Sequence, residues 1–309
     1  MSIGYECALS IACSHPEYLV VVASRSDRHR AAQAISNATG RLDAAVYMPL
    51  DLSNLSKVRE FAAGWAARKL PPIQGLVMNA GLQFPGGLHL TADGVEATFG
   101  VNHVGHALLF HLLLPHLAGD ARVVLTSSGV HDPDKKWGMP APDYDSAERL
   151  AHPPGGEAGD GAKRYTTSKL CNVMWAYALD RRLRSRGSRV SVTAFDPGLV
   201  PGTGLTREQP FAMRFIVGSV MPRMLPLLRA AFNANTHTPA ESGGNLARLA
   251  VGAGVEGVSG RYFEEGREEK SSALSYDEGK QEDLWRWTVG FVAREEEEKR
   301  RFDNLGDLK

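Results

Sequence analysis

The chain has 309 residues, and its 35 Lys and Arg balance its 35 Asp and Glu, so the formal net charge is zero. This balance argues against a nucleic-acid-binding protein, because such proteins carry excess positive charge to neutralise phosphates. Apolar residues at 43 % and charged residues at 23 % exclude a disordered chain. Cys7, Cys13 and Cys171 show no CxxC spacing and no signal peptide precedes them, which predicts reduced thiols in a cytoplasmic protein.

Short β-branched segments alternate with longer segments of helical periodicity, which predicts βα units feeding a parallel sheet. The expected strands are Tyr18–Ser24, Ala44–Leu50, Ile73–Asn79, Ala121–Ser127, Arg189–Phe195 and Gly260–Phe263. The expected helices are Ser26–Thr39, Ser53–Lys69, Thr91–Leu117, Tyr165–Arg186, Glu241–Ala250 and Tyr276–Arg301. Because no repeat or linker divides them, we expect one α/β domain over residues 1–309, a doubly wound parallel sheet of the Rossmann type.

Two long segments, residues 131–163 and 198–238, interrupt this alternation at the carboxyl ends of strands and are expected to shape a substrate pocket. The most apolar stretch, Phe211–Phe232, contains three arginines and two prolines, so no plain transmembrane span is expected there. Contact with a membrane surface or an apolar substrate stays open. The charge run Arg294–Arg301 is expected to be the solvated end of the last helix, within residues 276–301.

The segment Tyr165-Thr-Thr-Ser-Lys169 opens an expected helix, which places Tyr165 and Lys169 one turn apart on one face. An ammonium beside a phenol favours the phenolate, so the Tyr165 pKa is expected to fall from about 10 toward a range useful for acid/base catalysis. Three further signals precede it in order: Asn79-Ala80-Gly81 ends a strand, Asn102 lies in the next helix, and Ser127-Ser128 ends the next strand.

With these signals, residues from about Gly4 to Phe263 resemble the short-chain dehydrogenase/reductase family. The resemblance implies a catalytic tetrad of Asn102, Ser128, Tyr165 and Lys169. Tyr165 would exchange a proton with the substrate while hydride moves to or from nicotinamide, and Ser128 would hold the carbonyl oxygen. Lys169 would bind the nicotinamide ribose and lower the Tyr165 pKa. Asn102 would hold a water that relays protons, and Ser128 is preferred to Ser127 because the family normally uses the second serine.

The resemblance also implies cofactor-binding residues in the first half of the chain. The small residues Asn79, Ala80 and Gly81 would let the backbone approach the adenosine ribose, and Asp51-Leu52 match the pair that recognises adenine. Ile3-Gly4 align with the end of the glycine-rich turn that brings helix amides to the pyrophosphate.

The end of the strand Tyr18–Ser24 bears on the choice between NAD and NADP. An NAD-dependent member places an acid there for the ribose 2′-hydroxyl, whereas this chain has Ser24-Arg25. A guanidinium suits a 2′-phosphate, so NADP is expected ahead of NAD. Asp27 comes too late for the acid and is expected to lie at a helix N-terminus.

The sequence Asp196-Pro-Gly-Leu-Val-Pro-Gly-Thr-Gly204 resembles the family's loop for the nicotinamide carboxamide and pyrophosphate. Pro197, Gly198, Val200 and Thr203 would make those contacts, although Thr203 lies one residue later than the commonest spacing. This loop and the segments 128–131 and 275–285 most resemble the retinol dehydrogenase and protochlorophyllide reductase branch, which implies a small hydrophobic alcohol or carbonyl as substrate. The family habit is a dimer or tetramer, and that of the branch is often a monomer.

The resemblance departs from the family at the N-terminus, where the first strand and most of the glycine-rich turn are missing. Only Gly4 of the turn survives, and Ser2 stands in place of its middle glycine. Losing a central strand would leave two interior edges unpaired or force them together. Three explanations are open: a start site placed too late, an inactive truncated relative, or a rearranged sheet that still binds cofactor.

The histidines at 103, 106, 111 and 116 lack the spacing of a metal site, so no metal is expected. His103 and His106 are expected to pack or hydrogen bond beside Asn102, and His131 to lie near the substrate. The alternative to an oxidoreductase is a truncated, non-catalytic binding protein with the same fold. Light-driven reduction of a tetrapyrrole is a third hypothesis, which rests on the branch resemblance alone.

Overall fold

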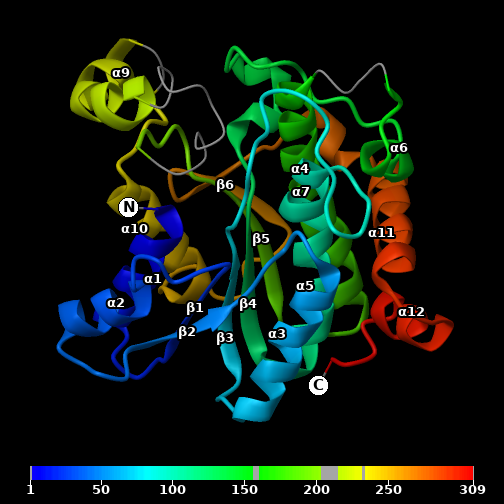
Figure 1. Ribbon diagram of the computed structural model, residues 1–309, viewed down its shortest axis with the longest axis horizontal. Coiled ribbons are helices and arrows are strands. Elements are labelled where there is room, and N and C mark those ends of the chain that lie inside the picture. The colour runs from blue at the N-terminus through cyan, green and yellow to red at the C-terminus, as the bar shows by residue number, and fades with distance from the viewer. Residues whose placement is uncertain (1, 156–159, 203–214, 232–233, 309) are drawn as a thin grey trace.

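The computed structural model describes residues 2–155, 160–202, 215–231 and 234–308, and in these residues seven strands form two sheets (Figure 1). The smaller sheet pairs β1 (Val20–Ser24) with β2 (Ala45–Pro49), and the larger has the order β3-β4-β5-β6-β7. All pairs are parallel except the β6–β7 hairpin, so the expected α/β class is confirmed. The strands of the larger sheet are β3 (Ile73–Met78), β4 (Leu117–Thr126), β5 (Ser191–Asp196), β6 (Arg261–Glu264) and β7 (Arg267–Glu269).

Within the described residues no strand joins β1 to β3, which agrees with the absent first strand expected from the sequence. The two interior edges stay unpaired and are not forced together. Val20, Val21 and Val22 of β1 are only half-buried, whereas β5 is buried along its whole length. The described strands are therefore divided into two sheets between β1 and β3.

Helix α1 (Ile3–Ser14) packs between the two sheets. Residues 3, 7 and 11, one turn apart, pack into a core shared with α10 (Pro239–Val251) and Phe195 of β5. Residues 5, 8, 9 and 12, on another face, pack with β1 and with α2 (Ala31–Thr39). The N-cap Ser2 accepts a hydrogen bond from the Tyr5 N–H at 3.3 Å and fixes the start of the helix.

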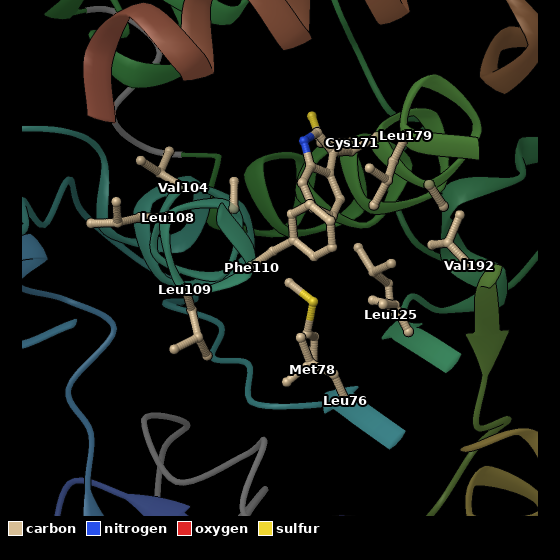
Figure 2. Packing of buried hydrophobic residues seen from close by; sticks show 14 of the residues in the cluster. Leu76, Met78, Val104, Leu108, Leu109, Phe110, Leu125, Cys171, Leu179 and Val192 are labelled. Carbon is tan, nitrogen blue, oxygen red and sulfur yellow. The ribbon is translucent and has the colours of Figure 1, made fainter. Parts of the chain in front are cut away.

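The main core lies on the other face of the larger sheet, under a row of helices (Figure 1). Met78 of β3 and Leu125 of β4 point toward Phe110 of α5 (Figure 2). Tight backbone approaches set this packing: a Cβ on Gly105 would lie 2.5 Å from the Leu52 carbonyl oxygen. The helices are α3 (Leu55–Arg68), α4 (Ala97–Phe99), η1 (Gly100–Val104), α5 (Gly105–Leu113), η2 (Leu114–His116), α7 (Gly161–Ser185) and α11 (Glu278–Val292).

Some elements differ from the expectation. Helix α7 begins four residues earlier because the Asp160 carboxylate accepts from the Lys163 N–H at 2.9 Å. The expected final helix is two helices, since α11 ends at Val292 and α12 covers Glu296–Asp303. The charge run is not a purely solvated end, because Glu298 forms a half-buried ion pair with Arg59 at 2.7 Å and anchors α12. The short strand β7 was not expected.

In their described residues, the two interrupting segments contain several short helices. The first contains η3 (Gly129–His131), η4 (Pro133–Lys135) and α6 (Ala147–Ala151). The second contains η7 (Ile216–Val220), η8 (Met221–Met224) and α9 (Leu225–Ala231), which lies apart from the strands (Figure 1). In the described chain, one helical stretch, Ala97–His116, matches a membrane span in length and apolarity, and 94 % of that window is buried inside the protein.

The α1–α10 contact yields a paired test of how the two sheets are held together. A Cβ on Gly243 would lie 2.5 Å from the Glu6 Cβ, whereas a Cβ on the neighbouring Gly244 would meet nothing within 4 Å. Gly243→Ala should destabilise the fold by about 1–3 kcal/mol through overpacking. Gly244→Ala should stabilise it by about 0.5–1 kcal/mol, because alanine favours a helix over glycine. Thermal unfolding followed by circular dichroism measures both, and equal melting temperatures for the two variants would contradict the proposed contact.

Candidate active site

The candidate active site lies where the carboxyl ends of β3, β4 and β5 meet, the edge at which parallel sheets bind ligands. Asn79 follows β3, Ser127 and Ser128 follow β4, and Asp196 ends β5. The Thr126 hydroxyl donates to the Asn79 amide oxygen at 3.2 Å and joins the first two strand ends. These residues therefore lie at the carboxyl ends of neighbouring parallel strands, as the order of the expected strands in the sequence implied.

The two serines after β4 have different partners. The buried Ser127 hydroxyl donates to the Lys169 backbone carbonyl at 2.7 Å and so anchors β4 to helix α7. The Ser128 hydroxyl instead hydrogen bonds to the Tyr165 phenol. Only Ser128 directs its hydroxyl toward a reactive group, in keeping with the preference for Ser128.

Lys169 and Tyr165 are both buried, and the Lys169 Nζ lies 5.7 Å from the centre of the Tyr165 ring. Nζ donates to the Thr126 carbonyl at 3.1 Å, and Asn172 donates to the same oxygen at 3.0 Å. Burial lowers the Lys169 pKa to about 8, and the Asp196 carboxylate opposes this fall. The ammonium is thus close to losing its proton within the physiological range.

The Tyr165 pKa is raised, mainly by burial and further by the charge of Asp196, while the Ser128 hydrogen bond partly offsets the rise. This direction is opposite to the lowering expected from the sequence. The physical reason is that a phenolate without water loses more solvation than its neighbours restore. At neutral pH the phenol keeps its proton.

Asn102 connects the strand ends to α7. It lies within η1, a π-helical turn, and its amide accepts from the Leu82 N–H at 2.8 Å and donates to the Leu82 carbonyl at 3.0 Å. Its Nδ2 also donates to the Ser168 hydroxyl at 3.0 Å. Asn102 therefore fixes the segment after Asn79-Ala80-Gly81 next to the helix that carries Tyr165 and Lys169.

The residues around Gly81 fit a nicotinamide dinucleotide. A Cβ on Gly81 would lie 3.4 Å from both the Lys169 Nζ and the Asn102 Oδ1, so glycine leaves space beside the ammonium. Of the three Lys169 N–H donors, the described part of the chain engages one, which leaves donors for ribose hydroxyls. A Cβ on Gly4 would lie 2.9 Å from the Asn79 Nδ2, so the N-terminus of α1 with Ile3 and Gly4 adjoins the same place.

The expected adenine-side residues lie on the smaller sheet and beside α3. Arg25 is exposed directly after β1, and Ser24 is exposed as the last residue of that strand. Asp27 accepts from the Ala31 N–H at 2.8 Å, which confirms its place at the start of α2. Asp51 accepts from the Ser53 hydroxyl at 2.6 Å, and Leu52 is buried against Gly105.

The loop after β5 is tightly fixed. Gly198 has φ +74°, and its Cβ position lies 2.2 Å from the Asn235 Oδ1, so no other residue fits. The Pro197 carbonyl accepts from the Ser242 hydroxyl at 3.0 Å, and Val200 is buried. Thr203 lies outside the described residues.

The buried histidines serve packing and hydrogen bonding. The His106 Nδ1 bonds the Asn102 carbonyl at 3.2 Å, as expected, while His103 Nε2 bonds the Thr288 hydroxyl at 2.9 Å. His111 stacks on Phe302 of α12. His131 accepts from the Ser272 N–H at 3.1 Å through Nε2, so its Nδ1 donates to the Ser128 carbonyl at 2.7 Å. In the described part of the chain no group of side chains has the arrangement of a metal site.

Sequence reasoning did not single out four side chains that hold the site together: Ser168, Asn172, Asp196 and Asn235. Asp196 had a detectable signal, because it directly follows the apolar Ala194 and Phe195 at the end of an expected central strand, before Pro-Gly. Asn235 had none, since it comes from a segment 39 residues away in the chain.

Comparisons with known proteins agree with this geometry. Residues 1–137 match the family model described as short chain dehydrogenase, and residues 204–300 match an AcuH dehydrogenase domain. A polyprenol dehydrogenase from Danio rerio is 32 % identical over 252 residues, which cover 80 % of this chain and 70 % of that protein. Retinol dehydrogenase 14 from Homo sapiens is 34 % identical over 238 residues, covering 76 % of this chain and 63 % of that protein.

Solved structures share the fold. An NADPH-bound carbonyl reductase from chicken fatty liver matches with a TM-score of 0.57 at 19 % identity. The matched region covers 87 % of this chain and 94 % of the reductase chain. A protein from Mycobacterium paratuberculosis has a TM-score of 0.59 at 24 % identity, with 88 % and 83 % covered.

The low pKa of Lys169 predicts a pH-dependent stability. Between about pH 8 and the unfolded value of 10.5 the unfolded chain holds more protons, so stability must rise with pH in this window. The melting temperature of the wild type relative to Lys169→Met should therefore increase from pH 7 to pH 10. The control Lys57→Met removes an exposed ammonium, and its melting-temperature difference should stay constant. A constant difference for Lys169→Met would contradict the assignment.

Proposed function

The chain belongs to the short-chain dehydrogenase family and is an NAD(P)-dependent oxidoreductase acting on CH–OH or C=O groups, and on that premise we propose an NADP-dependent enzyme that interconverts a hydrophobic alcohol and its carbonyl. The observation that carries the proposal is the cluster of half-buried Ser128 with buried Tyr165 and Lys169 at the strand ends. Its members supply a proton, a hydrogen bond and a positive charge within one small volume.

The proposed reaction assigns each group a step. NADP supplies or accepts a hydride at the substrate carbon when bound. The Tyr165 phenol gives its proton to the carbonyl oxygen, and the Ser128 hydroxyl donates a hydrogen bond to that same oxygen. Lys169 holds the ribose with its remaining N–H donors, and its charge stabilises the phenolate that forms. Asn102 holds the segment after Gly81 next to α7. As the resemblance implies, it would also hold a water next to Lys169.

The protonation states favour reduction. A buried phenol with a raised pKa is a proton donor at neutral pH, and Lys169 is largely a cation below about pH 8. Oxidation needs the phenolate instead and should become faster as pH rises, until Lys169 loses its charge. The intact cluster also disfavours a non-catalytic binding role.

Arg25 supports NADP over NAD. Its exposed guanidinium follows β1 directly, and the preceding residue is Ser24 rather than an acid. A 2′-phosphate would gain a charge-assisted hydrogen bond there, whereas a 2′-hydroxyl would gain little.

The segment from η7 to α9 supports a hydrophobic substrate. Ile216, Val220, Met224 and Leu227 recur at intervals of four, four and three residues and are 37–56 % exposed. Such an apolar stripe is typical of contact with an apolar ligand or a membrane surface. The names of the relatives, polyprenol and retinol dehydrogenase, refer to apolar alcohols. We accordingly include peripheral membrane contact in the proposal.

Tyr165→Phe tests the proton donor. Turnover of NADPH with a panel of apolar aldehydes and ketones should fall at least about 100-fold, the usual contribution of general acid catalysis. NADPH affinity, followed by its fluorescence, should stay nearly unchanged. Tyr177→Phe is the matched control, because it removes a buried hydroxyl from the same helix that bonds Ser271 outside the site. Near-normal turnover of Tyr165→Phe would refute the assignment.

Arg25→Ala tests the cofactor preference. The variant should bind NADPH about tenfold or more weakly, since a charge-assisted hydrogen bond contributes roughly 1.5–3 kcal/mol, and should bind NADH with little change. Arg28→Ala removes a second exposed arginine of the same connection and serves as control. Fluorescence titration gives both constants, and equal losses for the two cofactors would exclude a role in recognising the 2′-phosphate.

A further inference from the structure

Asp196 is a buried carboxylate for which the proposed reaction has no step. It is 1 % exposed, ends β5, and lies between the turn after Ser128 and the loop after Gly198. Its Oδ1 accepts from the Gly198 N–H at 3.0 Å, and its Oδ2 accepts from the Asn235 Nδ2 at 3.0 Å. Burying a charge is costly without such partners, so these bonds hold both the carboxylate and the loop in place.

Asn235 is itself oriented by the residues that follow it. The His237 ring nitrogen bonds the Asn235 Oδ1 at 2.9 Å, which leaves Nδ2 facing Asp196. Backbone bonds run from the Leu199 N–H to the Asn235 carbonyl at 2.8 Å and from the His237 N–H to the Leu199 carbonyl at 2.9 Å. The loop after β5 and residues 235–237 thus form one fixed unit whose polar centre is the Asp196 carboxylate.

The same carboxylate adjoins the catalytic cluster. A Cβ on Gly129, the residue after Ser128, would lie 2.8 Å from the Asp196 Oδ2, so the turn that presents Ser128 rests against this oxygen. The Asp196 charge raises the pKa of both Lys169 and Tyr165. Asp196 therefore contacts the loop proposed for the cofactor and acts electrostatically on the proposed proton donor.

Resting on the proposed function, we propose that Asp196 is a positioning residue, which fixes the loop 197–200 against the Ser128 turn and places its negative charge where it acts on the Tyr165–Lys169 pair. It touches neither reacting atom in this role. Its two contributions, hydrogen bonding to the loop and charge beside Lys169, can be separated by substitution.

Other ionisable groups face Asp196 from the neighbouring elements and bear on any pH dependence. Lys135 is paired with Glu264 and lies 5.6 Å from the centre of the Tyr262 ring. Burial lowers the His131 pKa, so this histidine is largely neutral at the pH of the test. Asp196 interacts electrostatically with Tyr165 and Lys169 from α7, His131 after β4, and Tyr262 from β6. Glu264 is its register partner on β6, His237 bonds Asn235, and Asp132 and Lys135 act on His131.

Two variants separate charge from hydrogen bonding. Asp196→Asn keeps an acceptor for Gly198 but removes the charge, so the alkaline limb of kcat for decanal reduction should move to lower pH by about one unit. Asn235→Ala keeps the charge but removes the hydrogen bonds that the Asn235 side chain makes with Asp196 and His237, so NADPH should bind about five- to tenfold more weakly while the alkaline limb stays in place. Asp180→Asn, a buried carboxylate at the far end of α7 paired with Arg184, controls for loss of a buried charge.

Each outcome decides the role of Asp196. If the alkaline limb of kcat does not shift in Asp196→Asn, and the melting temperature falls as it does in Asp180→Asn, the positioning role is overturned and Asp196 has a structural role alone. A limb shift in Asn235→Ala as large as in Asp196→Asn would also overturn it. If Asp196→Asn does not fold, an Asn235→Ala chain that binds NADPH normally refutes the loop role, and one that binds weakly with an unshifted limb supports it.

A failure of the proposed function is distinguishable from a failure of this inference. The wild type can fail to reduce any carbonyl and the role of Asp196 can still be tested. The test uses the pH window over which the melting temperature of the wild type rises relative to Lys169→Met. In an Asp196→Asn background, that window should begin about one pH unit lower. A window that begins at the same pH would refute the electrostatic role without any assay of activity.

Discussion

The packing of α1 between two separate sheets is the constraint on which the rest of the structure depends. No backbone ladder joins β1 to β3 in the described chain, so side-chain packing provides the connection. Part of it runs through two faces of α1, and part runs through the main core, which Val21 of β1 and Met48 of β2 also contact. The same helix brings Gly4 against Asn79. The position of Arg25, which follows β1, relative to Lys169 of α7 therefore depends in part on this packing.

Hydrophobic packing differs from a strand ladder in what it fixes. A ladder sets register through directional hydrogen bonds, whereas apolar burial is non-directional and tolerates small shifts. The close approach of α1 to Gly243 limits such shifts, because it leaves no room for a side chain between the helices. The residues expected to bind adenine are thus held partly by steric fit, whereas the candidate catalytic residues lie at the ends of strands in one continuous sheet.

The chemistry of the site results from competition between burial and nearby charge. Burial raises the pKa of Tyr165 and lowers that of Lys169, which on its own would give a neutral phenol beside a neutral amine. The Asp196 carboxylate opposes the change at the lysine and increases it at the tyrosine, so the pair is held as phenol and ammonium. One buried anion therefore keeps a proton donor and a cation side by side, without direct contact with a substrate.

The sequence by itself determined the α/β class and the order of the strands along the chain, and it predicted the residues of the candidate tetrad, since periodicity and motif order are local properties. The direction of the Tyr165 pKa shift was wrong, since the sequence shows which charges are nearby but not how much water is excluded. Only the tertiary structure decided that Asp196, Asn235 and Ser168 belong to the site and that α1 connects two sheets. These contacts join residues distant in the chain, and burial, which sets their strength, arises only when the core is packed.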